Sequence, residues 1–411
     1  MTTATTAAPA ATAAAPWRIA GWAAAGAIVA STALAVAAAR EAATAEHSPV
    51  VPLHGWEGVW TGSVAAALAV YGLGALAARR GGLRLRAALA VAVVVQVVPL
   101  AGPLLLSTDT TTYWANARVL VTHGANPYTT TPATFPRDPA TQASSLDWRH
   151  HTPPYGPAWE ALGAAPVPFV GSSASRAELA YRVLALLGVL AALAIVASST
   201  RSAAAVAFLG WSPLVAFHYT GGGHNDAWMV ALLLLGIAAR TRAAGGAAWS
   251  LAAAFKSVPV VFLPLELART RLRATRGFWL GLAATAVLVA AGSTAAFGTH
   301  WVTPALAAAH GSSPLGGVHF LAETGLRHRY AVALATLAFA AVYVVLLRSA
   351  WRTGRARHGL AASALCLAAS QLRPWYGLWA TGLAALEEDG LGMLAAYALT
   401  VYLVVWDAIP L

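Results

Sequence analysis

Long apolar segments recur along this chain and constrain its fold more than any other feature. A helix that crosses the hydrocarbon core of a bilayer needs about 20 predominantly apolar residues, and runs of this kind appear repeatedly in the 411 residues. Charged residues make up only 10% of the chain, whereas soluble domains carry about 25%. Short alternating segments, which would build a transmembrane β-barrel, are not found. The sequence therefore predicts an all-α integral membrane protein.

The arginines predict how the spans are oriented. Spans are expected at approximately 17–39, 58–78, 87–106, 180–199, 203–219, 226–239, 278–298, 330–348, 359–380 and 391–409. With a cytoplasmic N-terminus, the basic loops around Arg79, Arg201, Arg240 and Arg352 all lie inside, in agreement with the positive-inside rule. The net charge of +11 then reflects topology rather than binding of nucleic acid. We expect a multi-pass protein of the cell (plasma) membrane.

Two segments need a separate interpretation. Residues 1–16 are low-complexity and predict a disordered cytoplasmic tail ahead of a single multi-span domain, residues 17–411. Residues 245–268 are apolar but have basic flanks on both sides, so we expect a re-entrant hairpin that turns near Lys256 and Pro259. Two short spans or a shifted boundary would also explain the pattern.

Large external loops are expected at 40–57, 107–179 and 299–329, and long loops usually carry function. Asp109 follows a span directly at the outer face. A carboxylate in such a place can act as a general base, but it can also be the N-cap of the helix that follows. That helix contains Tyr113 and suits the membrane interface.

The stretch HYTGGGHNDAWMV, residues 218–230, joins two spans at the same face. Its glycines allow a tight turn and close approach to a ligand. His224, Asn225 and Asp226 stand where a helix N-terminus favours an anion. Asp226 can instead be a helix cap, and His218 and His224 could bind a metal together with Asp226.

Two cations lie in apolar surroundings. Lys256 is the single lysine of the chain, against 25 arginines. An ionisable group within a span indicates a functional site, although a lysine near a span end can also extend its ammonium to the interface. Arg373 precedes Pro374, which breaks a helix, and Trp375 and Tyr376 follow; these aromatics suit either an interfacial belt or stacking on a sugar.

Several motifs appear in an order that resembles a known family. They are the Asp109 to Tyr113 opening, GANPY (124–128), PPYGP (153–157), GHNDA (223–227), KSVPVVFLP (256–264) and RPWY (373–376). Over residues 85–380 the chain resembles the actinobacterial polyprenyl-phosphomannose-dependent mannosyltransferases, which belong to the GT-C class of integral-membrane glycosyltransferases. In that class the catalytic aspartate commonly follows the first span, whereas Asp109 follows the third expected span.

The resemblance implies a bundle of about 10–12 transmembrane helices with large extracytoplasmic loops and interfacial helices. It implies inverting, metal-independent transfer without a cofactor, from a polyprenyl-monophosphate-linked sugar to an extracytoplasmic glycan or glycolipid, among membrane lipids. Asp109 is then the expected base, and Lys256, Arg373 and His224 are expected at the donor phosphate. The expected substrate contacts are Tyr113, Asn126, Tyr128, Tyr155, Asn225, Asp226, Trp375 and Tyr376.

Other functions remain compatible with the sequence. A transferase for another lipid-linked sugar, such as arabinofuranose, would use the same fold. Intramembrane Lys256 is also a feature of transporters, although the internal repeats of many carriers are not detected. A non-catalytic membrane scaffold would tolerate alanine at Asp109 and Lys256.

Overall fold

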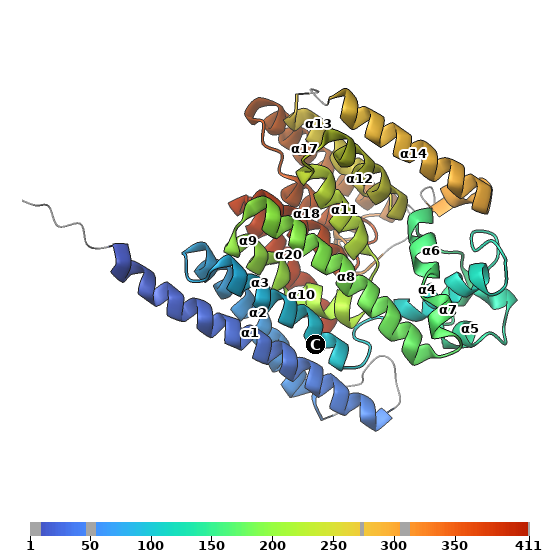
Figure 1. The fold of residues 1–411 in the computed structure, drawn as a ribbon, viewed down its shortest axis with the longest axis horizontal. Helices are drawn as coiled ribbons and strands as arrows, with labels where there is room; N and C mark the ends of the chain where they lie inside the picture. The colour runs from blue at the N-terminus through green and yellow to red at the C-terminus, as the bar shows by residue number, and fades with distance from the viewer. Residues whose placement is uncertain (1–9, 47–54, 272–274, 305–312, 410–411) are drawn as a thin grey trace, which may run out of the picture.

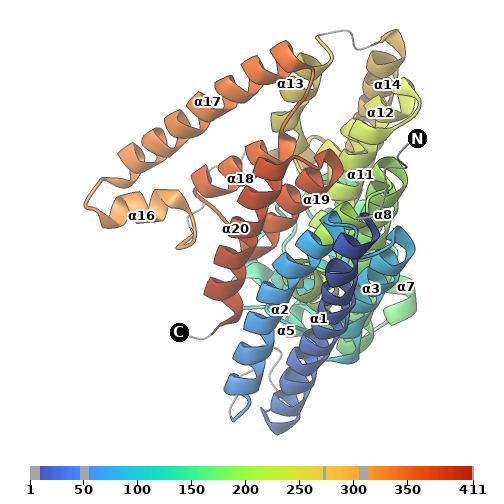
Figure 2. The same cartoon turned by 90° about the vertical axis from the view of Figure 1, so that its left-hand side faces the viewer.

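The computed structural model describes residues 10–46, 55–271, 275–304 and 313–409, and every regular element in these ranges is helical (Figure 1). The helices pack into a bundle (Figure 2). The all-α integral membrane fold predicted from the sequence is therefore confirmed.

The N-terminal helices form one side of the bundle. α1 (Ala10–Glu46) lies along α2 (Glu57–Arg79) (Figure 2), and α3 (Leu85–Val97) and α9 (Ala203–Gly210) pack against them. Because α1 begins at Ala10, the disordered tail expected over residues 1–16 is wrong for residues 10–16. The run of alanines there has high helix propensity; residues 1–9 lie outside the described residues.

The rest of the bundle consists of two further groups of helices. The first comprises α8 (Ala174–Thr200), α11 (Asp226–Ala238), α12 (Arg242–Phe255) and α14 (Arg276–Phe297). The second comprises α13 (Pro259–Arg269), α16 (Gly317–Glu323), α17 (His328–Thr353), α18 (His358–Ala368), α19 (Gly377–Glu387) and α20 (Gly390–Ala408). α12 and α14 approach so closely that a Cβ atom at Gly246 would lie 2.0 Å from the Phe278 carbonyl oxygen.

Fewer helices have the length of a full span than the sequence predicts. Six in the described ranges are long and apolar enough to cross a membrane, and a bent pair, residues 203–210 and 213–221, would make seven. Other expected spans are short apolar helices, 85–101, 226–238 and 358–368. Glycines 221–223 and Pro374 interrupt the helical pattern, so the chain leaves the helix inside the apolar region. The residues of the candidate site lie at these interruptions.

The segment expected to re-enter the membrane consists of two helices. α12 ends at Phe255 and α13 begins at Pro259, so the break falls at Lys256, as the sequence predicts. Lys256 itself has extended backbone, with φ −161° and ψ 140°. Whether the pair re-enters the bilayer stays a prediction.

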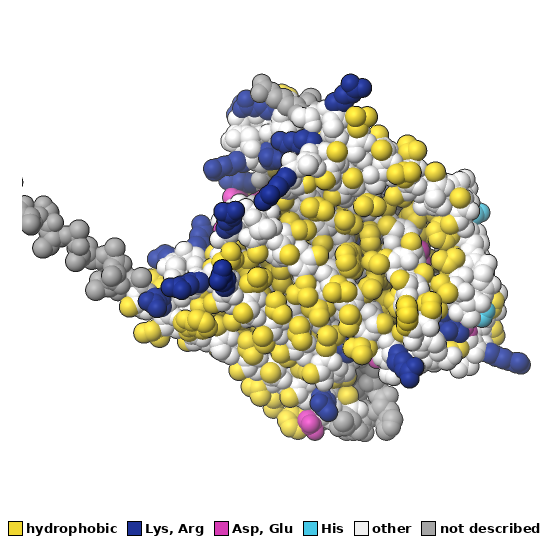
Figure 3. All heavy atoms as spheres, viewed as in Figure 1, with side chains coloured by type: hydrophobic (Ala, Val, Ile, Leu, Met, Phe, Trp, Pro, Cys, Tyr) yellow, Lys and Arg dark blue, Asp and Glu magenta, His cyan; other side chains and the backbone are white. Residues whose placement is uncertain are grey.

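The two ends of the bundle differ in chemistry. Figure 3 shows a broad apolar surface in the middle and most of the visible arginine and lysine side chains gathered toward one end. The short helices of loop 107–179 lie at the other end (Figure 1). They are α4 (Asp109–Val121), η2 (Pro132–Thr134), α5 (Pro139–Ala143), η3 (Trp148–His150), α6 (Pro157–Ala164) and α7 (Val167–Val170).

Arg182 of α8 holds the interrupted segments in place. Its guanidinium donates to the carbonyl oxygens of Thr220 and Gly102 at 2.9 Å each, and also to that of Pro99. The residue is 4% exposed. One buried side chain thus satisfies carbonyl groups that the broken helices leave free.

We expect Arg182→Met to destabilise the protein strongly, because three buried carbonyl oxygens would lose a charged donor. The free energy of unfolding should fall by about 3 kcal/mol or more. Thermal unfolding in detergent measures the change, with Arg176→Met, at an exposed position of the same helix, as the control. Equal unfolding temperatures for the two variants would contradict this role.

Candidate functional site

Two segments far apart in the sequence are joined near the N-terminal end of α8. The Leu105 amide donates to the Gly221 carbonyl oxygen at 3.0 Å. Gly223 has a φ of +77°, and a Cβ atom on it would lie 2.3 Å from Thr110 Cγ2. Only glycine fits this backbone conformation at this separation. The start of α4 is therefore held directly against the segment that carries His224.

Asp109 is the first residue of α4, but it does not cap the helix. Thr108 is the N-cap, and no side-chain capping bond is made there. The Asp109 carboxylate instead lies with Oδ2 3.3 Å from His224 Nδ1, and it accepts a hydrogen bond from the Tyr113 hydroxyl at 3.4 Å. Its side chain is 16% exposed. The carboxylate is thus positioned by two neighbours and remains accessible.

The surroundings of Asp109 favour its charged form. Burial acts to raise the pKa of the carboxyl group, but the contacts with His224 and Tyr113 and the charge of Arg373 outweigh it. The pKa is held below its usual range. Asp109 is therefore ionised at neutral pH and able to accept a proton.

His224 is fixed from its other side by an aromatic ring. Its imidazole stacks on Trp375, with ring centroids 3.8 Å apart and an interplanar angle of 17°. The Tyr219 hydroxyl donates to the Trp375 carbonyl oxygen at 2.6 Å and so fixes the same turn. Trp375 is therefore engaged with His224 over one of its faces.

Asp226 makes a second ion pair two residues further along. It is the first residue of α11, and its N-cap, Asn225, makes no side-chain capping bond. Asp226 Oδ1 accepts from Lys256 Nζ and from Trp379 Nε1, each at 2.9 Å. The ammonium also lies 4.3 Å from the centroid of the Tyr376 ring. Lys256 is therefore directed to a buried carboxylate, which does not fit the alternative of a snorkelling lysine.

Both carboxylate pairs flank one short segment. His224 contacts Asp109, and Asp226 contacts Lys256. The Cα atoms of residues 224 and 226 can be at most about 7 Å apart. The structure therefore brings together Asp109, His224, Asp226 and Lys256, which lie 147 positions apart at most (256 − 109) in the sequence.

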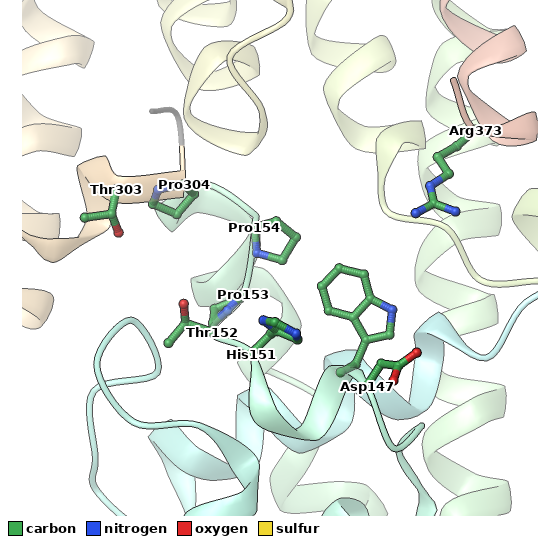
Figure 4. Close-up of a pocket in the computed structure, with 9 residues that line it drawn as sticks. Asp147, His151, Thr152, Pro153, Pro154, Thr303, Pro304 and Arg373 are labelled. Atoms are coloured by element: carbon green, nitrogen blue, oxygen red, sulfur yellow. The ribbon is translucent and has the colours of Figure 1, made fainter. Parts of the chain in front are cut away.

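Arg373 is the cation least engaged in this region. It precedes η6 (Pro374–Tyr376), and no carboxylate of the described residues lies within ion-pair distance of it. It reaches toward a cavity of about 470 Å³ beside the loop that carries Asp147 and His151 (Figure 4). The cavity lining is Asp147, Trp148, His151, Thr152, Pro153, Pro154, Thr303, Pro304 and Arg373.

A second cavity, of about 410 Å³, shares Pro154 and Pro304 with the first. Its polar lining consists of Lys256, Ser257, Ser370, Gln371, Tyr376 and Trp379. Its remaining lining is mainly apolar and includes Val258, Val261, Trp301, Val302 and Leu365. An amphipathic ligand would find a cation in this cavity and an apolar wall beside it.

The expected substrate residues divide into two groups. Tyr113 packs edge-on against Tyr155, with centroids 5.3 Å apart, so both rings border the Asp109 carboxylate. Asn126 donates to the Phe297 carbonyl oxygen at 2.8 Å and accepts from the Tyr128 amide, and the Tyr128 hydroxyl donates to the Tyr155 carbonyl oxygen at 3.0 Å. Asn126 and Tyr128 therefore hold the loop together, and their contact with substrate stays a prediction.

No group of three or more His, Cys, Asp or Glu residues within the described ranges is arranged to hold a metal ion. His218 does not converge with His224 and Asp226 on one point; its Nε2 lies 3.4 Å from Asp407 Oδ2 instead. The metal site considered for these three residues is therefore not formed. Metal independence of the reaction stays a prediction.

Some residues of the site were not recognised in the sequence. Trp379, whose sequence context suits either an interfacial belt or stacking on a sugar, donates to Asp226 instead. Arg182 and Asp407 were not considered at all, although a charged residue within an apolar run is a signal that would have identified both. Glu160 of α6 was also missed; it lies next to Trp159, which packs on Tyr113 at 4.9 Å.

Comparison with known proteins now assigns the class. Residues 16–271 match the model of a family described as alpha-(1->6)-mannopyranosyltransferase, N-terminal domain. The match covers more than half of the chain, which therefore belongs to this family of membrane mannosyltransferases, as the motif order predicted. A similar curated protein is alpha-(1->6)-mannopyranosyltransferase A of Corynebacterium glutamicum, 32% identical over 178 residues.

That alignment covers 41% of this chain and 36% of the relative, so the chain matches about a third of the relative's length. No solved structure matches the chain. The resemblance to actinobacterial mannosyltransferases is confirmed, whereas the roles of individual residues rest on the geometry described above.

Glu160 makes the stability of the protein depend on pH. The residue is 4% exposed, and burial raises the pKa of its carboxyl group to about 8 from an ordinary value of 4.5. Between these values the folded state holds this proton more tightly than the unfolded state does. The free energy of unfolding therefore falls as pH rises through that range.

We expect Glu160→Gln to remove part of this dependence. The unfolding temperature of the wild-type protein in detergent should decrease from pH 6 to pH 9, and the decrease should be smaller in the variant by a few degrees. Glu388→Gln, at an exposed position, is the control. Parallel curves for wild type and Glu160→Gln would show that Glu160 is ionised in the folded state at pH 6.

Proposed function

We propose that this chain is an inverting glycosyltransferase that moves mannose from a polyprenyl-monophosphate donor to a glycan or glycolipid acceptor. The observation that carries the proposal is the position of Asp109. Its ionised, partly accessible carboxylate flanks a segment that also contacts a cation at an apolar cavity. A base and a cation are the two groups that displacement at a sugar–phosphate bond requires.

The proposed reaction assigns one step to each group. Asp109 takes the proton of the acceptor hydroxyl while the hydroxyl oxygen of the acceptor bonds to the anomeric carbon of the donor sugar. The bond from that carbon to the phosphate oxygen breaks, and the electron pair goes to the phosphate. Arg373 stabilises the departing phosphate, since its charge is the less compensated one. Lys256 already donates to Asp226, so its remaining N–H groups add hydrogen bonds more than net charge.

The cavities suit the two substrates. We place the donor phosphate between Arg373 of the first cavity and Lys256 of the second, which share Pro154 and Pro304, and the first isoprene units in the second cavity, where Val258, Val261 and Leu365 supply apolar contact. We place the acceptor in the cavity with Trp148, His151 and Arg373, which is lined by the outer loop. The arginine-rich end then faces the cytoplasm, following the positive-inside rule, and the site faces outward in the plasma membrane. No metal is assigned a role.

The direct test uses purified protein in detergent with EDTA, radiolabelled polyprenyl-phosphomannose and a short mannoside. Label should appear in a longer mannoside. Polyprenyl-phospho-arabinofuranose serves as the competing donor, and its preferential use would move the assignment to another lipid-linked sugar. Absence of transfer from either donor would overturn the proposed chemistry.

We expect Asp109→Asn to reduce the transfer rate by about 10²–10⁴-fold, the range for loss of a general base, without loss of donor binding. Asp226→Asn should mainly lower the unfolding temperature, because its carboxylate is 1% exposed and bonded to Lys256. Asp389→Asn, far from the site at the start of α20, is the control, since Asn caps a helix as well as Asp. Full activity of Asp109→Asn with loss in Asp226→Asn would identify Asp226 as the base.

We expect the two cations to differ in their effects. Arg373→Met should lower the transfer rate by about 10²-fold through loss of transition-state stabilisation and leave the unfolding temperature nearly unchanged. Lys256→Met should lower the unfolding temperature, because Asp226 would remain buried without its partner. The double variant Lys256→Met/Asp226→Asn should recover stability but not donor KM. If the double variant recovered both, Lys256 would have no part in donor binding.

A further inference from the structure

His218 lies next to His224, with ring centroids 5.9 Å apart, and takes part in no step proposed above. It belongs to a π-helical turn, η4 (Ala216–Gly221), a rare conformation that is frequent at functional sites. Its side chain is fully buried. Yet its Nε2 lies 3.4 Å from Oδ2 of Asp407, in the last turn of α20, whose side chain is 28% exposed.

The four acidic and imidazole side chains form a row. Asp109 Oδ2 lies 3.3 Å from His224 Nδ1, the rings of His224 and His218 have centroids 5.9 Å apart, and His218 Nε2 lies 3.4 Å from Asp407 Oδ2. Trp375 stacks on His224 and lies 6.2 Å from His218, so an aromatic residue borders both rings. The row thus leads from the expected base to a second, solvent-accessible carboxylate.

The imidazole nitrogens are not satisfied by other groups. None of the four ring nitrogens makes a hydrogen bond within the described residues, and one nitrogen of each ring faces a carboxylate at ion-pair distance. The other two nitrogens, His224 Nε2 and His218 Nδ1, are available for proton transfer from one ring to the other. Buried polar atoms are normally paired, and one water molecule would bridge rings at this separation.

We propose that His218 and Asp407 are positioning residues that form a proton exit for the transferase, an inference that rests on the function proposed above. After each transfer the acceptor's proton resides on Asp109, and the bound substrates cover that carboxylate. The proton passes to Nδ1 of neutral His224, whose Nε2 releases a proton through one bridging water to His218 Nδ1; both imidazoles return to the Nε2–H tautomer before the next transfer. His218 releases one proton from Nε2 to Asp407, and Asp407 gives it to external water. Each hop breaks one N–H or O–H bond and forms one, so charge and atoms balance.

Loss of the proton exit should slow repeated transfer but not the first transfer. The first transfer needs only an ionised Asp109, whereas every later one needs the proton to have left. Single-turnover rates, with enzyme in excess over labelled donor, should therefore be within twofold of wild type for Asp407→Asn and His218→Gln. Their multiple-turnover rates should fall by about tenfold or more. A role limited to holding the fold would lower both rates together.

Two further readouts address proton transfer directly. Asp407→Glu should recover most of the multiple-turnover rate, and added imidazole should accelerate Asp407→Asn but not wild type. Asp389→Asn, the same chemical change at the opposite end of α20, should match wild type in both regimes. Asp109→Asn should be slow in both, which distinguishes loss of the base from loss of the exit.

Unchanged multiple turnover in both variants would overturn the proton exit and leave the proposed function intact. An equal loss of the single-turnover and multiple-turnover rates would also overturn the proton exit. His218 and Asp407 would then hold His224 in place without carrying a proton. No transfer by wild type in this assay would remove the proposed function and the exit with it.

Discussion

The close packing of Gly223 on Thr110 is the constraint on which the site depends. A Cβ atom at residue 223 would lie 2.3 Å from the Thr110 methyl group, and the φ of +77° independently requires glycine. This packing, together with the Leu105–Gly221 backbone hydrogen bond, brings the start of α4 against the start of α11. Both helices begin with an aspartate, and neither aspartate caps its helix. The two carboxylates are therefore free to pair with His224 and Lys256.

The pairing divides the charges of the site into two kinds. Asp226 and Lys256 compensate each other, which lets an ion pair remain in apolar surroundings. Asp109 and Arg373 are less compensated and more accessible. Chemistry at a lipid-linked phosphate requires a base and a cation of this second kind, whereas the compensated pair fixes the geometry between them.

Sequence reasoning identified the parts of the site more reliably than their connections. Apolar runs and arginine placement predict the membrane class. The isolated Lys256, Asp109 at a span end, and His224 and Asp226 after the glycine-rich turn identify the four central residues. The Lys256–Asp226 and His218–Asp407 contacts join residues 30 and 189 (407 − 218) positions apart, and no local pattern indicates such pairs. The number of full spans was overestimated for a different reason: helices end near Pro99, Pro213 and Pro374 within apolar runs, which hydropathy alone does not detect.

The most direct test of the account is an experimental structure with a non-transferable polyprenyl-phosphomannose analogue bound. The account predicts the phosphate within hydrogen-bond distance of Arg373, the first isoprene units against Val258 and Leu365, and the anomeric carbon on the side of the site that Asp109 faces. A phosphate bound at the arginine-rich end of the bundle, or a prenyl chain outside the cavity with Lys256, would contradict it.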